Sequence, residues 1–215
     1  MKYVNIPGFG RTSTFLMITP LLLSFQSIPQ TAATRETEGF VVSGFLPDYC
    51  NHVNVTAASA FLTDLILYSV HPANASEQEL LSLSEQCCIK PHQYKDAAAA
   101  VNANNNNNTA SDDSRMKTRI WASIGGHHGR SQAFPQLGAS VAFLDNLVEL
   151  CEEYNLHGID MFWDDPKTKQ DMDTYSRILM DAADTLHAEG FQISLTTRQF
   201  FRPDVVNKMD RINLP

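Results

Sequence analysis

Several features are scarce or missing in this sequence, and each absence argues against a class of protein. Its 215 residues include 16 Lys and Arg against 24 Asp and Glu, giving a formal net charge of −8. This acidic balance argues against a nucleic-acid partner or an anionic membrane surface. The four cysteines show no CxxC spacing, so a structural zinc site is not expected. No GxGxxG or P-loop pattern follows the first predicted strand, so dinucleotide or phosphate binding there is not supported.

The first 33 residues differ in composition from the rest. They contain Lys2 and Arg11 and no acidic residue, and residues 15–25 form the apolar run FLMITPLLLSF, followed by small and polar residues. This pattern is typical of a secretory signal, and the run is shorter than the roughly 20 apolar residues that span a bilayer. We therefore predict a signal peptide over residues 1–33, a secreted or secretory-lumen protein, and no membrane span in the mature chain. A retained signal anchor and an organelle transit peptide are the alternatives.

Cysteines and glycosylation triplets fit an exported protein. Asn-X-Ser/Thr triplets begin at Asn54, Asn74 and Asn107, which predicts a glycoprotein. Cys50 with either Cys87 or Cys88 is the candidate disulfide in an oxidising compartment. Cys151 falls on the apolar stripe of a predicted helix, which favours a buried free thiol.

Short apolar runs alternate with helical patterns along residues 39–215. Strands are predicted for 39–47, 62–70, 118–124, 156–163, 191–197 and 209–214. Helices are predicted for 76–85, 140–154 and 173–188, the last of them ending at Gly190. The Ala- and Asn-rich segment 96–113 is predicted to be a disordered surface insertion, because it cannot bury enough apolar surface. This alternation predicts an α/β fold, either an open doubly wound sheet or a (β/α) barrel.

Two motifs stand at the ends of the third and fourth predicted strands. The third strand ends in Ser123-Ile124-Gly125-Gly126, and residues 157–165 read HGIDMFWDD. Together they resemble the chitinase-type glycoside hydrolases of family 18, whose third strand carries SxGG and whose fourth carries DGxDxDxE. The resemblance covers nearly all of residues 40–215. It implies a (β/α)8 TIM barrel that hydrolyses or binds chitin or other β-1,4-linked N-acetylglucosamine (GlcNAc) glycans, with no cofactor.

The resemblance also assigns candidate catalytic residues. In the family, the last acid of DGxDxDxE is a Glu that protonates the glycosidic oxygen. The sugar's own acetamido group acts as nucleophile and is hydrogen-bonded by the middle Asp. Residues i, i+2 and i+4 of a strand share a face, so Asp160, Phe162 and Asp164 are predicted to line the barrel interior, with Asp164 nearest the C-terminal mouth. Asp164 and Asp160 are therefore the candidate catalytic residues.

Catalysis is expected to be weakened by two departures from the motif. Asp164 is one methylene shorter than Glu, and a misplacement of about 1 Å can cost about 100-fold in rate. Phe162 replaces the middle Asp and can neither accept a hydrogen bond nor carry charge.

The candidate substrate-binding residues surround the same mouth. They are Phe45, Ser123, Gly125, Gly126, His127 and Phe162. The glycines let the backbone and a sugar ring approach closely. His127 and His128 stand where the family usually has Trp and could hydrogen-bond sugar hydroxyls. A metal site with His71 is the alternative, but a polar lining is commoner, so no metal is expected. At Phe45, core packing competes with sugar stacking.

Three neighbouring side chains are predicted to lie away from the mouth. His157 is expected to be packed at the start of the fourth strand, and Trp163 is expected to face the helices. Asp165 points away from the interior by strand alternation. It is therefore a weaker candidate for the acid than Asp164.

The resemblance stops short of the family's last elements. Leu214-Pro215 precede the expected Met-x-Tyr of the sixth strand, so about six of eight βα units are predicted, forming an incomplete barrel. Three hypotheses remain open at this stage. The first is an exported hydrolase that uses Asp164 as a weakened general acid. The second is a chitinase-like lectin that binds GlcNAc glycans without cleaving them. The third is a fragment or truncated gene product without independent activity.

Overall fold

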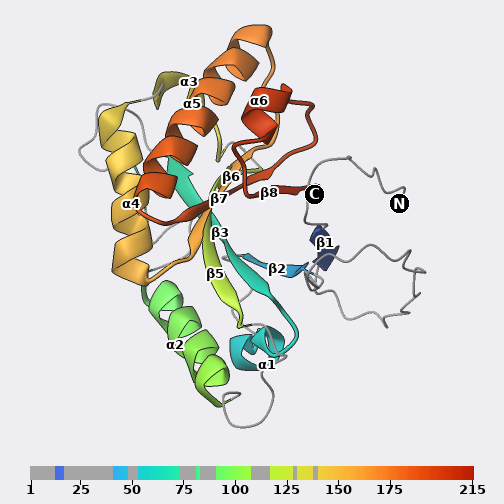
Figure 1. Cartoon of the computed structure of the whole chain (residues 1–215), viewed down its shortest axis with the longest axis vertical. Coiled ribbons are helices and arrows are strands. Elements are labelled where there is room, and N and C mark those ends of the chain that lie inside the picture. The colour runs from blue at the N-terminus through green and yellow to red at the C-terminus, as the bar shows by residue number, and fades with distance from the viewer. Residues whose placement is uncertain are drawn as a thin grey trace, which may run out of the picture.

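A computed structural model describes residues 13–16, 41–47, 53–72, 81–82, 91–107, 117–127, 130–137 and 140–215. Its strands are β1 (Ser13–Leu16), β2 (Val41–Pro47), β3 (Asp64–Pro72), β4 (Leu81–Ser82), β5 (Arg119–Gly126), β6 (Gly158–Trp163), β7 (Gln192–Thr196) and β8 (Arg211–Asn213). Its helices are α1 (Val55–Ser59), α2 (Pro91–Asn107), α3 (Phe134–Leu137), α4 (Val141–Tyr154), α5 (Lys169–Ala188) and α6 (Pro203–Val206). The strands form one curled sheet, and α4 and α5 cover its outer face (Figure 1).

All six predicted strands are confirmed, as β2, β3, β5, β6, β7 and β8. They are parallel neighbours in chain order, which is the arrangement of an incomplete (β/α)8 barrel. Two further strands were not predicted: β4 pairs antiparallel with β3, and β1 pairs parallel with β2. The residues of β1 lie within the segment 1–33, whose role as a signal peptide stays a prediction.

The two long helices beside the C-terminal strands follow the sequence pattern. α4 begins after Ser140, whose side chain accepts a hydrogen bond from the backbone N–H of Phe143. α5 begins four residues before its predicted start, because Thr168 and Asp171 form a capping box. The predicted stripe of α5 is fully buried and consists of Tyr175, Ile178, Leu179, Ala182 and Leu186. Gly190 follows α5 with a φ of 82°, as expected of a helix stop.

The prediction of disorder for 96–113 is wrong for residues 96–107, which belong to helix α2. Tyr94, Ala97 and Val101 recur at helical spacing and are buried, so the Ala tract supplies an apolar face after all. Asparagine side chains near the C-terminal end of α2 hydrogen-bond to backbone groups of neighbouring segments. Asn104 donates to the Thr56 carbonyl oxygen, and Asn105 accepts from the Thr118 backbone N–H at 3.1 Å. Residues 108–113 lie outside the described ranges.

The predicted helix over 76–85 is wrong at residues 81–82, which form β4, and its remaining residues lie outside the described ranges. Cys50, Cys87, Cys88 and Asn74 also lie outside them. Cys151 is a buried free thiol, as predicted, and burial raises its pKa to about 12. No helix in the described part of the chain is both long and apolar enough to cross a membrane.

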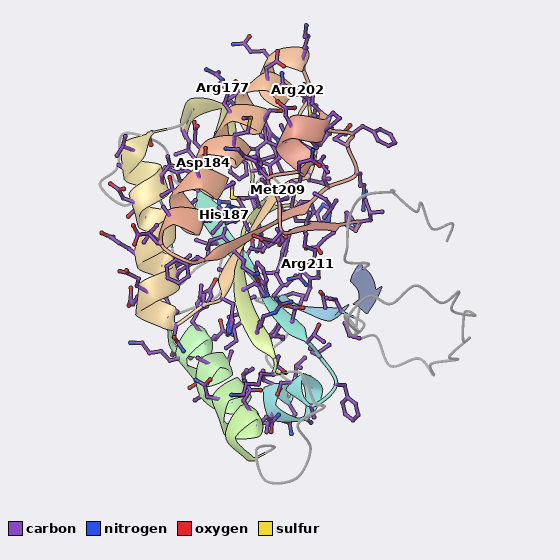
Figure 2. All side chains as sticks on the ribbon, viewed as in Figure 1. Arg177, Asp184, His187, Arg202, Met209 and Arg211 are labelled. Carbon is purple, nitrogen blue, oxygen red and sulfur yellow. The ribbon has the colours of Figure 1, made fainter. Side chains whose placement is uncertain are left out.

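A buried charge cluster ties together strands from both ends of the half-barrel. Asp64 on β3 is fully buried and lies 2.8 Å from Arg119 on β5 and 2.8 Å from Arg211 on β8. The Trp121 Nε1 donates to the Asp64 carboxylate at 2.7 Å, and the Arg211 guanidinium lies 4.5 Å from the Trp121 ring centre. Arg211, labelled in Figure 2, also donates to Ser43 on β2 at 2.9 Å. β2 and β8 are thus connected across the interior, which fixes the curl of the sheet.

The pKa of Asp64 reflects this cluster. Burial pushes the pKa upward, but the charges and hydrogen bonds of Arg211 and Arg119 outweigh burial and hold it below the ordinary carboxyl value. Asp64 is therefore an anion in the folded protein at neutral pH, compensated by two guanidinium groups.

Candidate functional site at the C-terminal mouth

The site consists of three layers of side chains along the inside of the half-barrel. They follow from strand alternation, which points every second residue of β5, β6, β7 and β8 inward. The Asp64 cluster is the lowest layer, Asp160 lies in the middle, and Phe162 and Asp164 stand above Asp160 toward the C-terminal mouth. The predicted orientation of Asp160 and Phe162 is thus confirmed.

Asp160 is completely buried among short polar side chains. Its carboxylate accepts from Ser123 on β5 at 3.0 Å, from Ser194 on β7 at 2.7 Å and from Thr196 at 2.8 Å. The amide of Asn213 on β8 donates to it at 3.0 Å. Burial raises the pKa of Asp160 above its ordinary value, and these hydrogen bonds offset only part of the increase. The carboxylate thus binds four strands together inside the barrel.

Asp164 and His127 form an acid–imidazole pair at the mouth. Asp164 Oδ2 lies 2.7 Å from His127 Nδ1, and about a third of each side chain is exposed. The sequence places these residues directly after β6 and β5, and the two strands are parallel neighbours. The acid predicted as proton donor is therefore engaged by a histidine from the adjacent strand.

Aromatic rings separate Asp160 from this pair. Phe162 is only 3% exposed, and its ring lies edge-on to His127 with centres 4.8 Å apart. Tyr68 on β3 lies 6.0 Å from Phe162 and 6.4 Å from Phe45, and its hydroxyl accepts from the His127 backbone N–H at 2.6 Å. The Arg130 guanidinium lies 5.4 Å from the Tyr68 ring centre. The mouth thus has an aromatic floor with polar groups above it.

The two motif glycines fit a crowded turn at the end of β5. Gly125 and Gly126 have φ values of 89° and 119°, a region that side chains rarely adopt. A Cβ on Gly125 would strike the carbonyl oxygen of Phe162, and one on Gly126 would strike the Tyr68 ring. Ser131 stabilises the turn, because its hydroxyl accepts a hydrogen bond from the Gly126 N–H at 2.9 Å. The glycines let Tyr68 and His127 lie against the strand end.

The remaining predicted residues are placed as follows. Phe45 is half-buried on β2 beside Tyr68. Trp163 stacks on Phe134 of α3 with ring centres 5.4 Å apart, which confirms that it faces the helices. Asp165 is exposed and pairs with Lys167, away from the interior as expected.

The three other histidines considered from the sequence, His71, His128 and His157, do not join the site as a group. The prediction that His157 is packed is wrong, because the residue is exposed just before β6 begins. His71 lies on β3 near its pairing with β4, and His128 lies outside the described ranges. Within those ranges, no group of three or more His, Cys, Asp or Glu residues could hold a metal ion.

Sequence reasoning missed several members of the site. Tyr68 and Ser131 bring the backbone of the β5 turn into place, yet neither was predicted as a site residue. The partners of Asp160 did leave a signal, because Ser194 and Thr196 alternate with apolar residues along β7. Two polar residues with a period of two in a buried strand indicate a polar barrel interior.

The strands, the inward layers and the acid at the C-terminal mouth define a (β/α) half-barrel of the TIM-barrel class, with its candidate site at the end where such barrels place their active sites. The family model described as "Glycosyl hydrolases family 18" matches residues 28–213. The chain therefore belongs to glycosyl hydrolase family 18.

Solved structures support the same fold. A chitinase-like agglutinin from Robinia pseudoacacia superposes with a TM-score of 0.64 at 15% identity, over 80% of this chain and 53% of the agglutinin. A class V chitinase from Nicotiana tobaccum gives 0.62 at 16% identity, over 80% and 51%. A family 18 chitinase from Cycas revoluta in complex with (GlcNAc)3 gives 0.63 at 13% identity, over 80% and 54%. This chain thus spans about half the length of these proteins. No curated protein matches it.

Proposed function

We propose that this protein binds β-1,4-linked GlcNAc glycans at the C-terminal mouth without the substrate-assisted cleavage of its family. The observation that carries the proposal is the separation of the two retained acids. Asp160 is sealed below Phe162 with all its hydrogen bonds made inside the barrel, while Asp164 pairs with His127 at 2.7 Å. Phe162 occupies the position from which the family's middle Asp would reach the acetamido group, and it offers no acceptor.

The composition of the mouth supports glycan binding. Sugar rings present apolar faces and hydroxyl edges, and the mouth combines the half-buried Tyr68 ring, which lies 6.0 Å from the buried Phe162 ring, with polar groups from Asp164 and His127. Gly126 adds no side chain beside the Tyr68 ring, where a Cβ would collide with that ring. Among the proteins of similar fold, one is an agglutinin and one is a chitinase bound to (GlcNAc)3.

The test is calorimetric titration of (GlcNAc)6 into the purified chain, with an assay for reducing ends on the same samples. We expect saturable binding and no release of reducing sugar. His127→Ala should weaken binding about 2- to 12-fold, the range for loss of one hydrogen bond. His157→Ala is the matched control, because this exposed histidine lies at the opposite end of β6, and it should leave the affinity unchanged. No saturable binding by the wild-type chain, or equal affinities for both variants, would contradict the proposal.

Weak hydrolysis is a second candidate, favoured by the partial exposure of Asp164 at the mouth and by its contact with the His127 imidazole. On this hypothesis, the wild-type chain releases reducing ends slowly from (GlcNAc)6, and Asp164→Asn abolishes the release while the glycan still binds. Release that survives Asp164→Asn would exclude Asp164 as the general acid.

Export is part of the proposal and rests on the composition of residues 1–33. Asn54 is exposed and begins a glycosylation triplet, so its side chain is accessible to modification. Expression in a eukaryotic secretory host should yield a secreted glycoprotein whose N-terminus follows Ala33. Its mass should fall on enzymatic removal of N-linked glycans. A secreted protein that retains residues 13–16 would contradict cleavage and would favour β1 as a permanent strand.

A further inference from the structure

The last peptide group of β6, between Phe162 and Trp163, is hydrogen-bonded to a side-chain hydroxyl on each side. The Ser131 hydroxyl donates to the Phe162 carbonyl oxygen at 3.0 Å, and the Trp163 N–H donates to the Tyr175 hydroxyl at 3.1 Å. The C=O and N–H of a trans peptide point in opposite directions, so the two hydroxyls approach from opposite sides. Asp164 follows this peptide directly. The backbone from which Asp164 extends is therefore restrained on both sides.

Tyr175 supplies a hydrogen-bond acceptor where the pairing of β6 with β7 has ended. That pairing stops at Met161, while the pairing of β6 with β5 continues to Trp163. Beyond Met161, the Trp163 N–H has its acceptor on α5 instead. Ser131 connects the same peptide to the end of β5, because its hydroxyl accepts from the Gly126 N–H at 2.9 Å and lies 2.8 Å from the Gly126 carbonyl oxygen. The two strand ends that form the mouth are thus joined through side chains.

The Tyr175 side chain has a fixed position and stays neutral. It is fully buried, and its ring centre lies 5.3 Å from Trp163, 5.3 Å from Phe134 and 5.8 Å from Phe201. Burial and the charge of Asp160 raise the pKa of Tyr175 well above the ordinary tyrosine value, so the hydroxyl remains protonated. Packing therefore sets the place of this hydroxyl.

The acid–imidazole pair that this backbone supports is partly exposed. Asp164 Oδ2 lies 2.7 Å from His127 Nδ1, and about a third of each side chain is exposed. Exposed pairs are usually weak, because ordering two side chains in one geometry costs conformational entropy. The Tyr68 hydroxyl already orders the His127 backbone, because it accepts from the His127 N–H at 2.6 Å. Ser131 and Tyr175 do the same for the backbone before Asp164. The geometry of the pair thus depends on hydroxyls outside it.

We propose that Tyr175, with Ser131 opposite it, is a positioning residue that holds the Asp164 carboxylate against the His127 imidazole. This inference rests on the proposed function, because it gives the pair a role in contacting the glycan. Without the Tyr175 hydroxyl, the Trp163 N–H loses its acceptor, and the segment that carries Asp164 can move away from His127. Glycan binding then weakens although the side chains at the mouth are unchanged.

Two buried tyrosines allow a controlled test. Tyr175→Phe removes the hydroxyl and keeps the ring in its packing. Tyr154→Phe is the matched control, because Tyr154 is 5% exposed and lies at the last position of α4, just before β6 begins. Tyr154 therefore lies near the end of β6 opposite to Asp164. A general loss of stability from a missing buried hydroxyl would affect both variants, whereas a loss of positioning affects Tyr175→Phe alone.

The first measurement is the imidazole nitrogen NMR spectrum of His127, recorded at one pH for all variants. In the wild type, Nδ1 faces a carboxylate, so its resonance should be that of a hydrogen-bonded N–H. Asp164→Ala removes the carboxylate and gives the reference signal of a released imidazole. We expect Tyr175→Phe and Ser131→Ala to move the Nδ1 resonance toward this reference, and Tyr154→Phe to keep it at the wild-type position. A wild-type resonance in Tyr175→Phe or Ser131→Ala would overturn the proposal.

The second measurement is the affinity for (GlcNAc)6 by calorimetric titration. Tyr175→Phe should weaken binding about 2- to 12-fold, the range for loss of one hydrogen bond, and Tyr154→Phe should match the wild type. In a His127→Ala background, Tyr175→Phe should add less than about 2-fold, because the pair that it positions is already gone. Equal losses in both backgrounds would also overturn the proposal, since Tyr175 would then act on binding independently of the pair. Absence of binding by the wild-type chain would refute the proposed function, while the His127 resonances would still decide the positioning role.

Discussion

Replacing Asp64 with Ala should destabilise the protein strongly, because Asp64 is the only carboxylate among the described residues that the structure pairs with Arg211. The side chain of Arg211 is 3% exposed and that of Asp64 is fully buried, so removal of the anion leaves a guanidinium in the interior without a counter-charge. Breaking a buried ion pair in this way costs about 3 to 5 kcal/mol. Arg119, at 22% exposure, reaches solvent more readily and adds less to the loss.

For a domain of this size, 1 kcal/mol shifts the melting temperature by about 2 to 4 °C, so the expected decrease is about 6 to 20 °C. The assay is thermal unfolding followed by circular dichroism at pH 7, with Asp204→Ala as the control. Asp204 also pairs with an arginine, but its side chain is 53% exposed, and exposed pairs contribute little. Equal melting temperatures for the two variants would refute the assignment of Asp64 as a stabilising anion.

The loss of stability in Asp64→Ala should depend on pH. The lowered pKa of Asp64 contributes stability that is present above the ordinary carboxyl pKa of about 3.9 and is lost as the pH falls through the lower folded value. The difference between the wild type and Asp64→Ala should therefore narrow below about pH 4. A difference that stays constant from pH 7 to pH 2 would contradict this linkage.

Three further predictions concern other parts of the molecule. Gly126→Ala should lower the melting temperature and weaken glycan binding together, because the new methyl group collides with Tyr68 at a positive φ; unchanged binding in calorimetry would contradict this. Asn105→Ala should speed amide hydrogen exchange in the last turns of α2, because its side chain bonds both the N–H and the carbonyl of Thr118; wild-type protection there would count against this docking. Cys151 should react with a thiol reagent only after denaturation, because it is buried with a pKa of about 12, and rapid labelling of the native protein would disprove its burial.

The strands of the half-barrel could be predicted because each carries its own signal. Runs of Val, Ile, Leu and Phe bounded by polar residues mark strands buried on two faces, and all six were located. The helix α2 could not be predicted in the same way. Its apolar face consists mostly of small Ala side chains, which give a weak sequence signal. Its order also depends on Asn104 and Asn105 contacting backbone groups at Thr56 and Thr118, more than ten residues away in sequence.

The candidate site also has a part that could be predicted from the sequence and a part that could not. Strand alternation in one motif was enough to place Asp160 and Phe162 inside the barrel and Asp165 outside it. The contact between Asp164 and His127 depends on the register of β5 and β6, which pairs Gly126 with Trp163. Register is set by packing and backbone pairing across the whole sheet, so no local sequence pattern predicts it.

By itself, the sequence showed the resemblance to the family through the motifs of its third and fourth strands. It also located six parallel strands, the helices α4 and α5 and the inward side chains of Asp160 and Phe162, because these follow from periods of two and 3.6 residues. The tertiary structure decided which of those side chains meet. It placed a buried anion between two arginines, sealed Asp160 under an aromatic ring and paired Asp164 with His127. Such contacts join residues that are far apart in sequence, and their energies depend on burial and distance, which exist only in the folded chain.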